Sequence, residues 1–124
     1  MRLLIEATLE AAGATLAYRR YGAVDNTAIL LLHGARMDGR IWARAARELA
    51  RTHGVVVPDL RGRGGSSCDP AIPASFVADT LLLIDRLELS RVHLVGHSMG
   101  GGVALELAWR LSETTASPPL ATGA

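Results

Sequence analysis

A single serine lies between glycines in residues 94–102, where an apolar run gives way to apolar positions at helical spacing. Gly96 and Gly100 stand two residues before and two residues after Ser98. A serine at the tip of a sharp strand-to-helix turn has a strained backbone, and the residues two positions away must be almost free of side chains. The helix after such a turn directs its N-terminal amides and positive dipole end toward an anion formed beside the serine. The pattern therefore predicts a nucleophilic serine at position 98.

A serine hydroxyl needs a neighbouring base to take its proton, and the four histidines of the chain are poorly placed for that task. His97 adjoins Ser98, so the sharp turn should direct its side chain elsewhere. His33 follows an apolar run, His53 precedes one and His93 lies within one. We expect a structural or surface position for each histidine in preference to the role of general base.

The elements that must position these residues are indicated by hydrophobic periodicity. Three apolar runs have the composition of parallel strands, at residues 28–32, 54–57 and 91–95. Apolar positions at helical spacing predict three helices, over about residues 40–51, 76–87 and 99–111. Two alternating runs predict an antiparallel hairpin at a sheet edge, at residues 2–11 and 14–20. The alternation predicts an α/β fold with a mostly parallel sheet, flanking helices and functional loops at the carboxyl ends of the strands.

The motifs at these strand ends resemble those of the N-terminal half of the α/β-hydrolase fold family. They occur in the family's order: His33 and Gly34 after the first run, residues 59–66 (DLRGRGGS) after the second, and residues 96–101 (GHSMGG) after the third. The resemblance covers about residues 1–111. A partial α/β-hydrolase fold is what it implies, with the C-terminal half of the sheet absent.

The resemblance also implies roles for individual residues. Ser98 would be the nucleophile, and the backbone amides of Ala35 and Met99 would bind the oxyanion, each donor changing the rate by about a hundredfold or more. His33 would be a structural residue of the oxyanion loop. Asp59 is similar to an aspartate that organises the loops and not to the catalytic acid.

A catalytic acid and a catalytic histidine follow the serine in this family, on loops after later strands that the sequence does not contain. Beyond residue 111 the sequence becomes small, aperiodic and proline-containing. We therefore expect one domain over residues 1–111 and a disordered tail over residues 112–124. Half a sheet would expose an edge strand and apolar faces, which predicts self-association through that edge.

The implied activity is serine-dependent hydrolysis of an ester or similar small acyl substrate, and this small molecule is the partner that the resemblance implies. Negligible turnover is expected without the acid and the histidine. The alternative is a noncatalytic, truncated fragment that folds by self-association or with a partner chain. Lyase, haloperoxidase-like and acyltransferase reactions stay open because a fold does not fix a reaction. The serine disfavours the chemistry of relatives with an aspartate nucleophile.

Composition excludes several other classes of function. The 124 residues carry a formal net charge of +1 and are 49% hydrophobic, which offers no electrostatic footprint for nucleic acid. Cys68 is the only cysteine, so we expect no disulfide within the chain, and neither a metal site nor a cofactor is indicated. No apolar stretch is long enough to span a bilayer, so the default expectation is a cytoplasmic protein without membrane contact.

Overall fold

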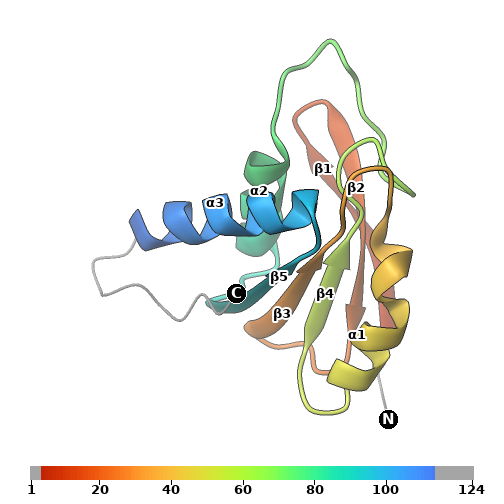
Figure 1. The fold of residues 1–124 in the computed structure, drawn as a ribbon, viewed down its shortest axis with the longest axis vertical. Coiled ribbons are helices and arrows are strands. Elements are labelled where there is room, and N and C mark those ends of the chain that lie inside the picture. The colour runs from red at the N-terminus through yellow and green to blue at the C-terminus, as the bar shows by residue number, and fades with distance from the viewer. Residues whose placement is uncertain (1–3, 114–124) are drawn as a thin grey trace.

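The computed structural model describes residues 4–113, which form a mixed five-stranded sheet with helices on both faces (Figure 1). The strands are β1 Leu4–Ala11, β2 Ala14–Tyr21, β3 Thr27–Leu32, β4 Val55–Pro58 and β5 Arg91–Gly96, in the spatial order β1-β2-β4-β3-β5. β3 is parallel to both β4 and β5, whereas β2 is antiparallel to β1 and to β4. The predicted α/β class and the predicted edge hairpin are confirmed.

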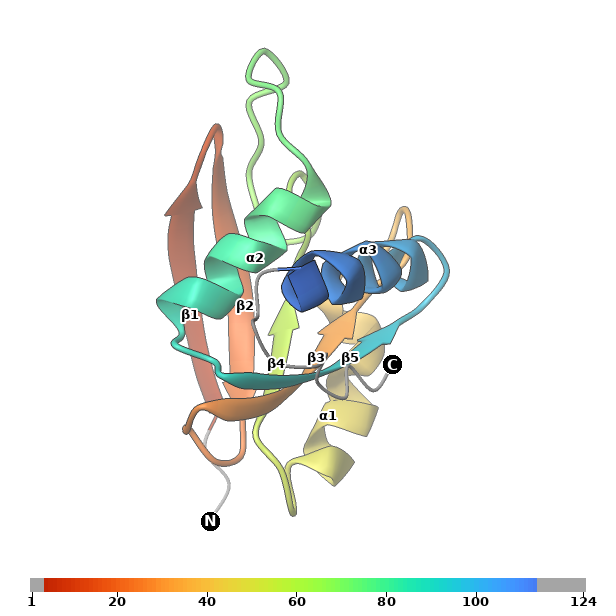
Figure 2. The same cartoon turned by 90° about the vertical axis from the view of Figure 1, so that its left-hand side faces the viewer.

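The helical segments are η1 Gly39–Trp42, α1 Ala43–Leu49, α2 Phe76–Arg86 and α3 Met99–Glu113. Helices α2 and α3 cover one face of the sheet and α1 covers the other (Figure 2). The central strand β3 explains this layering, because its side chains alternate between two cores. Leu30 and Leu32 pack toward α2 and α3, whereas Ile29 and Leu31 pack toward α1. An unbroken apolar run is what such a two-sided strand requires.

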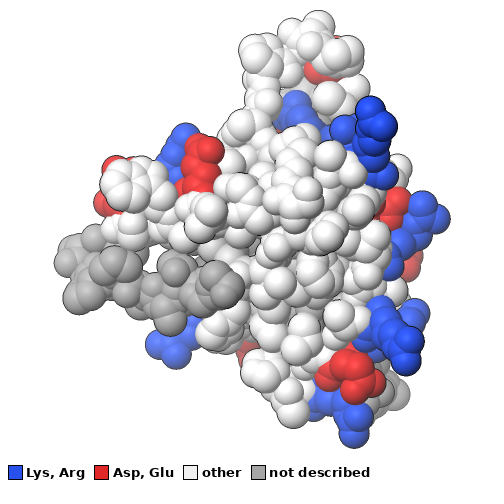
Figure 3. All heavy atoms as spheres, viewed as in Figure 1, with Lys and Arg blue, Asp and Glu red and all other residues white. Residues whose placement is uncertain are grey.

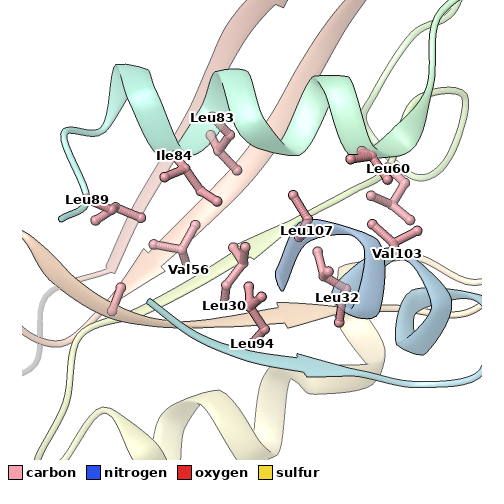
Figure 4. Close-up of a cluster of buried hydrophobic side chains, with 13 residues drawn as sticks. Leu30, Leu32, Val56, Leu60, Leu83, Ile84, Leu89, Leu94, Val103 and Leu107 are labelled. Carbon is pink, nitrogen blue, oxygen red and sulfur yellow. The ribbon is translucent and has the colours of Figure 1, made fainter. Parts of the chain in front are cut away.

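The larger core lies between the sheet and the pair α2 and α3. Leu30 and Leu94 from adjacent strands point toward Leu83 of α2 and Leu107 of α3 (Figure 4). All four side chains are at most 1% exposed. Burying such a side chain stabilises the fold by about 1.5 to 3 kcal/mol relative to leaving it exposed, so this cluster fixes α3 firmly on β5.

Two predicted elements differ from the structure at their ends. The helix expected from residue 40 starts with the short 3₁₀ segment η1, because the Asp38 carboxylate accepts the backbone N–H of Arg40 and caps the chain there. The α-helical part then spans only Ala43–Leu49. At the other end, α3 continues to Glu113, two residues past the expected limit. The rest of the expected tail, residues 114–124, lies outside the described residues, as do residues 1–3.

Candidate active site

Ser98 lies at the sharp turn between β5 and α3. Its φ is 55°, in the left-handed region of backbone conformation that residues other than glycine rarely adopt. The turn leaves no room for a side chain at position 96 or at position 100. A Cβ atom on Gly96 would overlap the carbonyl of Gly100, and a Cβ atom on Gly100 would overlap the carbonyls of Leu32 and His33. The two glycines singled out in the sequence are therefore required by close backbone contacts within the elbow and against the end of β3.

The loop after β3 packs directly on this elbow. A Cβ atom on Gly34 would lie 3.1 Å from the carbonyl oxygen of His97 and 3.3 Å from Cβ of Ser98. The backbone amides of Ala35 and Met99 donate no hydrogen bond to any described residue. The backbone adjoining Ser98 therefore has two amide donors that no described residue engages.

His33 is fully buried, and both of its ring nitrogens are engaged. The backbone N–H of Leu60 donates to Nε2 at 2.9 Å, and Nδ1 lies 2.8 Å from the carbonyl oxygen of Gly34. Because Nε2 accepts, the proton of the neutral ring is assigned to Nδ1, which donates to Gly34. His33 therefore ties β3 to the end of β4 and has no nitrogen left to take a proton from Ser98.

Asp59 joins the two loops that follow β3 and β4. Its Oδ1 accepts the N–H of Gly39 at 2.6 Å, and its Oδ2 accepts the N–H of Gly65 at 2.9 Å. The Ser66 hydroxyl donates to the Asp59 carbonyl at 2.6 Å. This buried carboxylate fits the loop-organising position expected from the resemblance, since each of its oxygens holds a different loop.

Two further ion pairs stiffen the same loops. Arg40 binds Asp38 at 2.8 Å, and hydrogen bonds from Arg40 lower the pKa of the Asp38 carboxyl to about 2. Arg61 donates to both carboxylate oxygens of Asp79, at 2.7 and 2.9 Å, and the same hydrogen bonds raise the pKa of Arg61. Arg61 also donates to the carbonyl of Ala12 at 2.6 Å. Sequence inspection missed this pair because its members lie in different elements, far apart in the chain.

The other histidines form no hydrogen bond with Ser98 within residues 4–113. The Ser98 hydroxyl makes no hydrogen bond to a described residue, and His97 is exposed beside it. His53 lies with Nδ1 2.8 Å from the Thr52 hydroxyl, and His93 is part of β5. A proton acceptor for Ser98 is therefore missing from the described part of the site.

The described residues contain neither a metal-binding cluster nor a membrane-spanning helix. No group of three or more His, Cys, Asp or Glu side chains among them is arranged to hold a metal ion. Cys68 is a free, exposed thiol. None of the described helices has the length and apolar character needed to cross a bilayer.

Residues 29–124 match the model of the alpha/beta hydrolase family. The chain belongs to this family. It is 40% identical over 88 residues to a fluoroacetate dehalogenase from a Burkholderia species, covering 65% of this chain and 29% of that protein. It superposes with a TM-score of 0.77 and 32% identity on a thioesterase domain from the curacin biosynthetic pathway, covering 86% of this chain and 40% of that one. A hydrolase from Pseudomonas aeruginosa gives a TM-score of 0.75 and 34% identity, with 83% and 40% covered.

This hydrolase-family chain spans less than half the length of these relatives, between 29% and 40%. The two superpositions cover 86% and 83% of this chain. The names of the relatives cover different reactions, a dehalogenase and a thioesterase among them. Family membership therefore establishes a hydrolase fold without fixing the bond that is cleaved.

Proposed function

We propose that Ser98 is the nucleophile in hydrolysis of an ester or similar small acyl substrate, with the amides of Ala35 and Met99 as oxyanion donors. The observation that carries this proposal is the elbow, where a serine with a φ of 55° lies against the loop that holds one free amide and precedes the other. Such strain persists where function requires it. The likeness to a thioesterase domain also favours acyl chemistry.

In the proposed reaction the Ser98 oxygen adds to the acyl carbon, and its proton passes to a base. The carbonyl oxygen becomes negatively charged and accepts hydrogen bonds from the two amides. The intermediate then expels the alcohol, which takes a proton, and water hydrolyses the acyl-serine in a second, similar step. The described residues offer the nucleophile and the donors. They offer no histidine hydrogen-bonded to Ser98, so an external base is the natural way to test them.

The test is chemical rescue with imidazole. The 124-residue protein is assayed with 4-nitrophenyl acetate, with and without imidazole, beside the Ser98→Ala variant and a protein-free blank. We expect negligible Ser98-dependent turnover without imidazole, because the hydroxyl is a poor nucleophile until a base takes its proton. Added imidazole should produce a saturable rate above the blank that the alanine variant lacks. Equal rates for both proteins at every imidazole concentration would overturn the proposal.

A noncatalytic role is the second candidate, and the unpaired Ser98 hydroxyl is the observation that favours it. Under that hypothesis the chain keeps the elbow as an element of its fold and performs no acyl transfer. Mass spectrometry after incubation with the ester and imidazole separates the two candidates. An acyl adduct on Ser98 supports the enzyme, and an unmodified serine supports the noncatalytic role.

A further inference from the structure

His33 follows β3 directly, and its buried ring lies between two segments of backbone. The N–H of Leu60, which follows β4, donates to Nε2 at 2.9 Å. On the other side of the ring, Nδ1 lies 2.8 Å from the carbonyl oxygen of Gly34. Gly34 is also the residue whose added Cβ atom would lie 3.3 Å from Cβ of Ser98. The ring therefore connects the end of β4 to the backbone that touches the proposed nucleophile.

The contact with Leu60 determines which nitrogen of the ring carries the proton. A backbone N–H is a donor, so Nε2 must be the unprotonated nitrogen that accepts. The proton of a neutral imidazole then lies on Nδ1. Neither nitrogen has another hydrogen-bond partner among the described residues. Nδ1 is consequently a donor with one acceptor, the Gly34 carbonyl.

This hydrogen bond fixes the orientation of the peptide unit between Gly34 and Ala35. The N–H of Met37 reaches the same carbonyl oxygen at 3.3 Å and supports the same orientation. A trans peptide unit is planar, and its N–H points opposite to its C=O. Because the Gly34 carbonyl is directed at the His33 ring, the Ala35 N–H is directed away from it. Ala35 is exposed, and so is Ser98.

The opposite orientation of this peptide unit would be unfavourable for acyl transfer. The Ala35 N–H donates to no described residue, so it is available to a ligand. If the peptide unit turned over, the Gly34 carbonyl oxygen would replace this N–H on the exposed side. A carbonyl oxygen repels an oxyanion, whereas an N–H stabilises it. The hydrogen bond from the ring therefore selects the one orientation that suits the reaction.

We propose that His33 is a positioning residue of the proposed oxyanion site. The Leu60 amide sets the tautomer of the ring, and the protonated Nδ1 holds the peptide unit so that the Ala35 N–H is presented to the oxyanion. The inference rests on the proposed function for the reaction that this amide serves. The orientation of the amide can nevertheless be measured without turnover.

Two substitutions separate the two hydrogen bonds of the ring. In His33→Asn the side-chain amide can place a donor where Nδ1 lies, which keeps the bond to Gly34 and loses the bond from Leu60. In His33→Gln the longer side chain can place an acceptor where Nε2 lies, which keeps the bond from Leu60 and loses the bond to Gly34. Each variant gives up one hydrogen bond, so a purely structural role predicts equal effects. His53→Gln is the matched control, because His53 is exposed and its Nδ1 lies 2.8 Å from the Thr52 hydroxyl.

The orientation of the Ala35 amide is measured by NMR, as the residual dipolar coupling of its N–H in the weakly aligned 124-residue chain. We expect the wild type, His33→Asn and His53→Gln to give the same coupling, and His33→Gln to give a different one. The amides of β3 and β4 should keep their couplings in all four proteins. An Ala35 coupling that His33→Gln leaves unchanged would overturn the inference.

The tautomer of His33 is measured in the wild type alone, so this test does not depend on the folding of a variant. A long-range ¹H–¹⁵N spectrum recorded on the neutral ring should show the proton on Nδ1 and none on Nε2. A proton on Nε2 would be incompatible with the proposed donor to Gly34 and would reject the positioning role.

Kinetics connect the orientation of the amide to the reaction. At saturating imidazole, kcat for 4-nitrophenyl acetate should fall about a hundredfold or more in His33→Gln, the effect of losing one oxyanion donor, with KM little changed. His33→Asn and His53→Gln should stay close to the wild type. Equal losses of kcat in the two His33 variants would contradict the inference. Absence of Ser98-dependent turnover in the wild type, together with the expected couplings, would reject the acyl hydrolysis and retain the role of His33 in orienting the amide.

Discussion

At the scale of single residues, two carboxylates determine how the segments after β3 and β4 are held. Asp59 is buried and accepts a hydrogen bond from a backbone amide of each segment, so it holds the two segments together. Asp38 lies at the start of η1, where it caps the backbone of Arg40 and pairs with the Arg40 side chain. The first position was open to prediction from the family motif. The position of Asp38 could not be predicted in this way, because its capping role depends on where the chain turns after β3.

Asp38 should make the folding free energy depend on pH in the acid range. Its pKa is lowered from 3.8 to about 2 in the folded state, so its contribution is complete above about pH 4 and is lost as the pH falls toward 2. The Arg40 side chain is 80% exposed, so screening limits this contribution to about 1 kcal/mol or less. Urea unfolding of the wild type and of Asp38→Asn should show a difference at pH 6 that vanishes near pH 2. A difference independent of pH would contradict the assigned ion pair.

At the scale of elements, the ion pair of Arg61 and Asp79 fastens three parts of the chain. Arg61 follows β4, Asp79 lies in the first turn of α2, and the carbonyl of Ala12 belongs to the hairpin turn. Both charged side chains are at most 7% exposed. The pair therefore sets where α2 lies relative to the hairpin, a relation that no helical or strand periodicity encodes.

We expect removal of one member of this ion pair to lower the free energy of unfolding more than removal of both members does. Arg61→Met or Asp79→Leu alone leaves a buried charge unpaired and should destabilise the protein by about 3 to 5 kcal/mol. The double variant leaves no unpaired charge. Its loss of stability should be much smaller than the sum of the losses in the two single variants. Denaturant unfolding of the four proteins gives the coupling energy. Additive losses would show that the two side chains do not act as a pair.

The sequence predicted the elements better than their contacts. β3 could be recognised because burial on both faces requires an unbroken apolar run, and Gly96 and Gly100 because the elbow leaves no room for Cβ atoms. The 3₁₀ segment η1 could not be predicted from the sequence, since the apolar residues have helical spacing throughout residues 40–51. The engagement of both His33 nitrogens was also hidden, because the Leu60 amide meets the ring only after β3 and β4 pair.

At the scale of the whole molecule, β5 is an edge strand among the described residues, with β3 on its one paired side. Backbone groups on the other side of β5 are free to pair with another chain. Helix α3, which packs on β5, exposes Leu105 and Trp109 by 73% and 63%. The broad uncharged face in Figure 3 offers no like-charge repulsion to a second copy.

We expect the protein to self-associate through this edge. Sedimentation equilibrium should show an average mass that rises with concentration, because two copies pair their edge strands and cover their apolar residues. Leu105→Glu together with Trp109→Glu should shift the equilibrium to the monomer, while Val24→Glu, at a loop residue that is 46% exposed, should not. A monomer at every concentration, or equal effects of all these variants, would contradict the predicted surface.

The strand order has a further consequence during synthesis. β3 lies in the sheet between β4 and β5, and both partners follow it in the chain. At about 5 to 20 residues per second, the synthesis of β3 is complete on the order of 3 to 13 s before that of β5. Its apolar segment has no native neighbour to pair with until β4 arrives. Nascent chains of this protein therefore present β3 as the natural binding segment for a chaperone, in a stretch that the finished sheet buries on both faces.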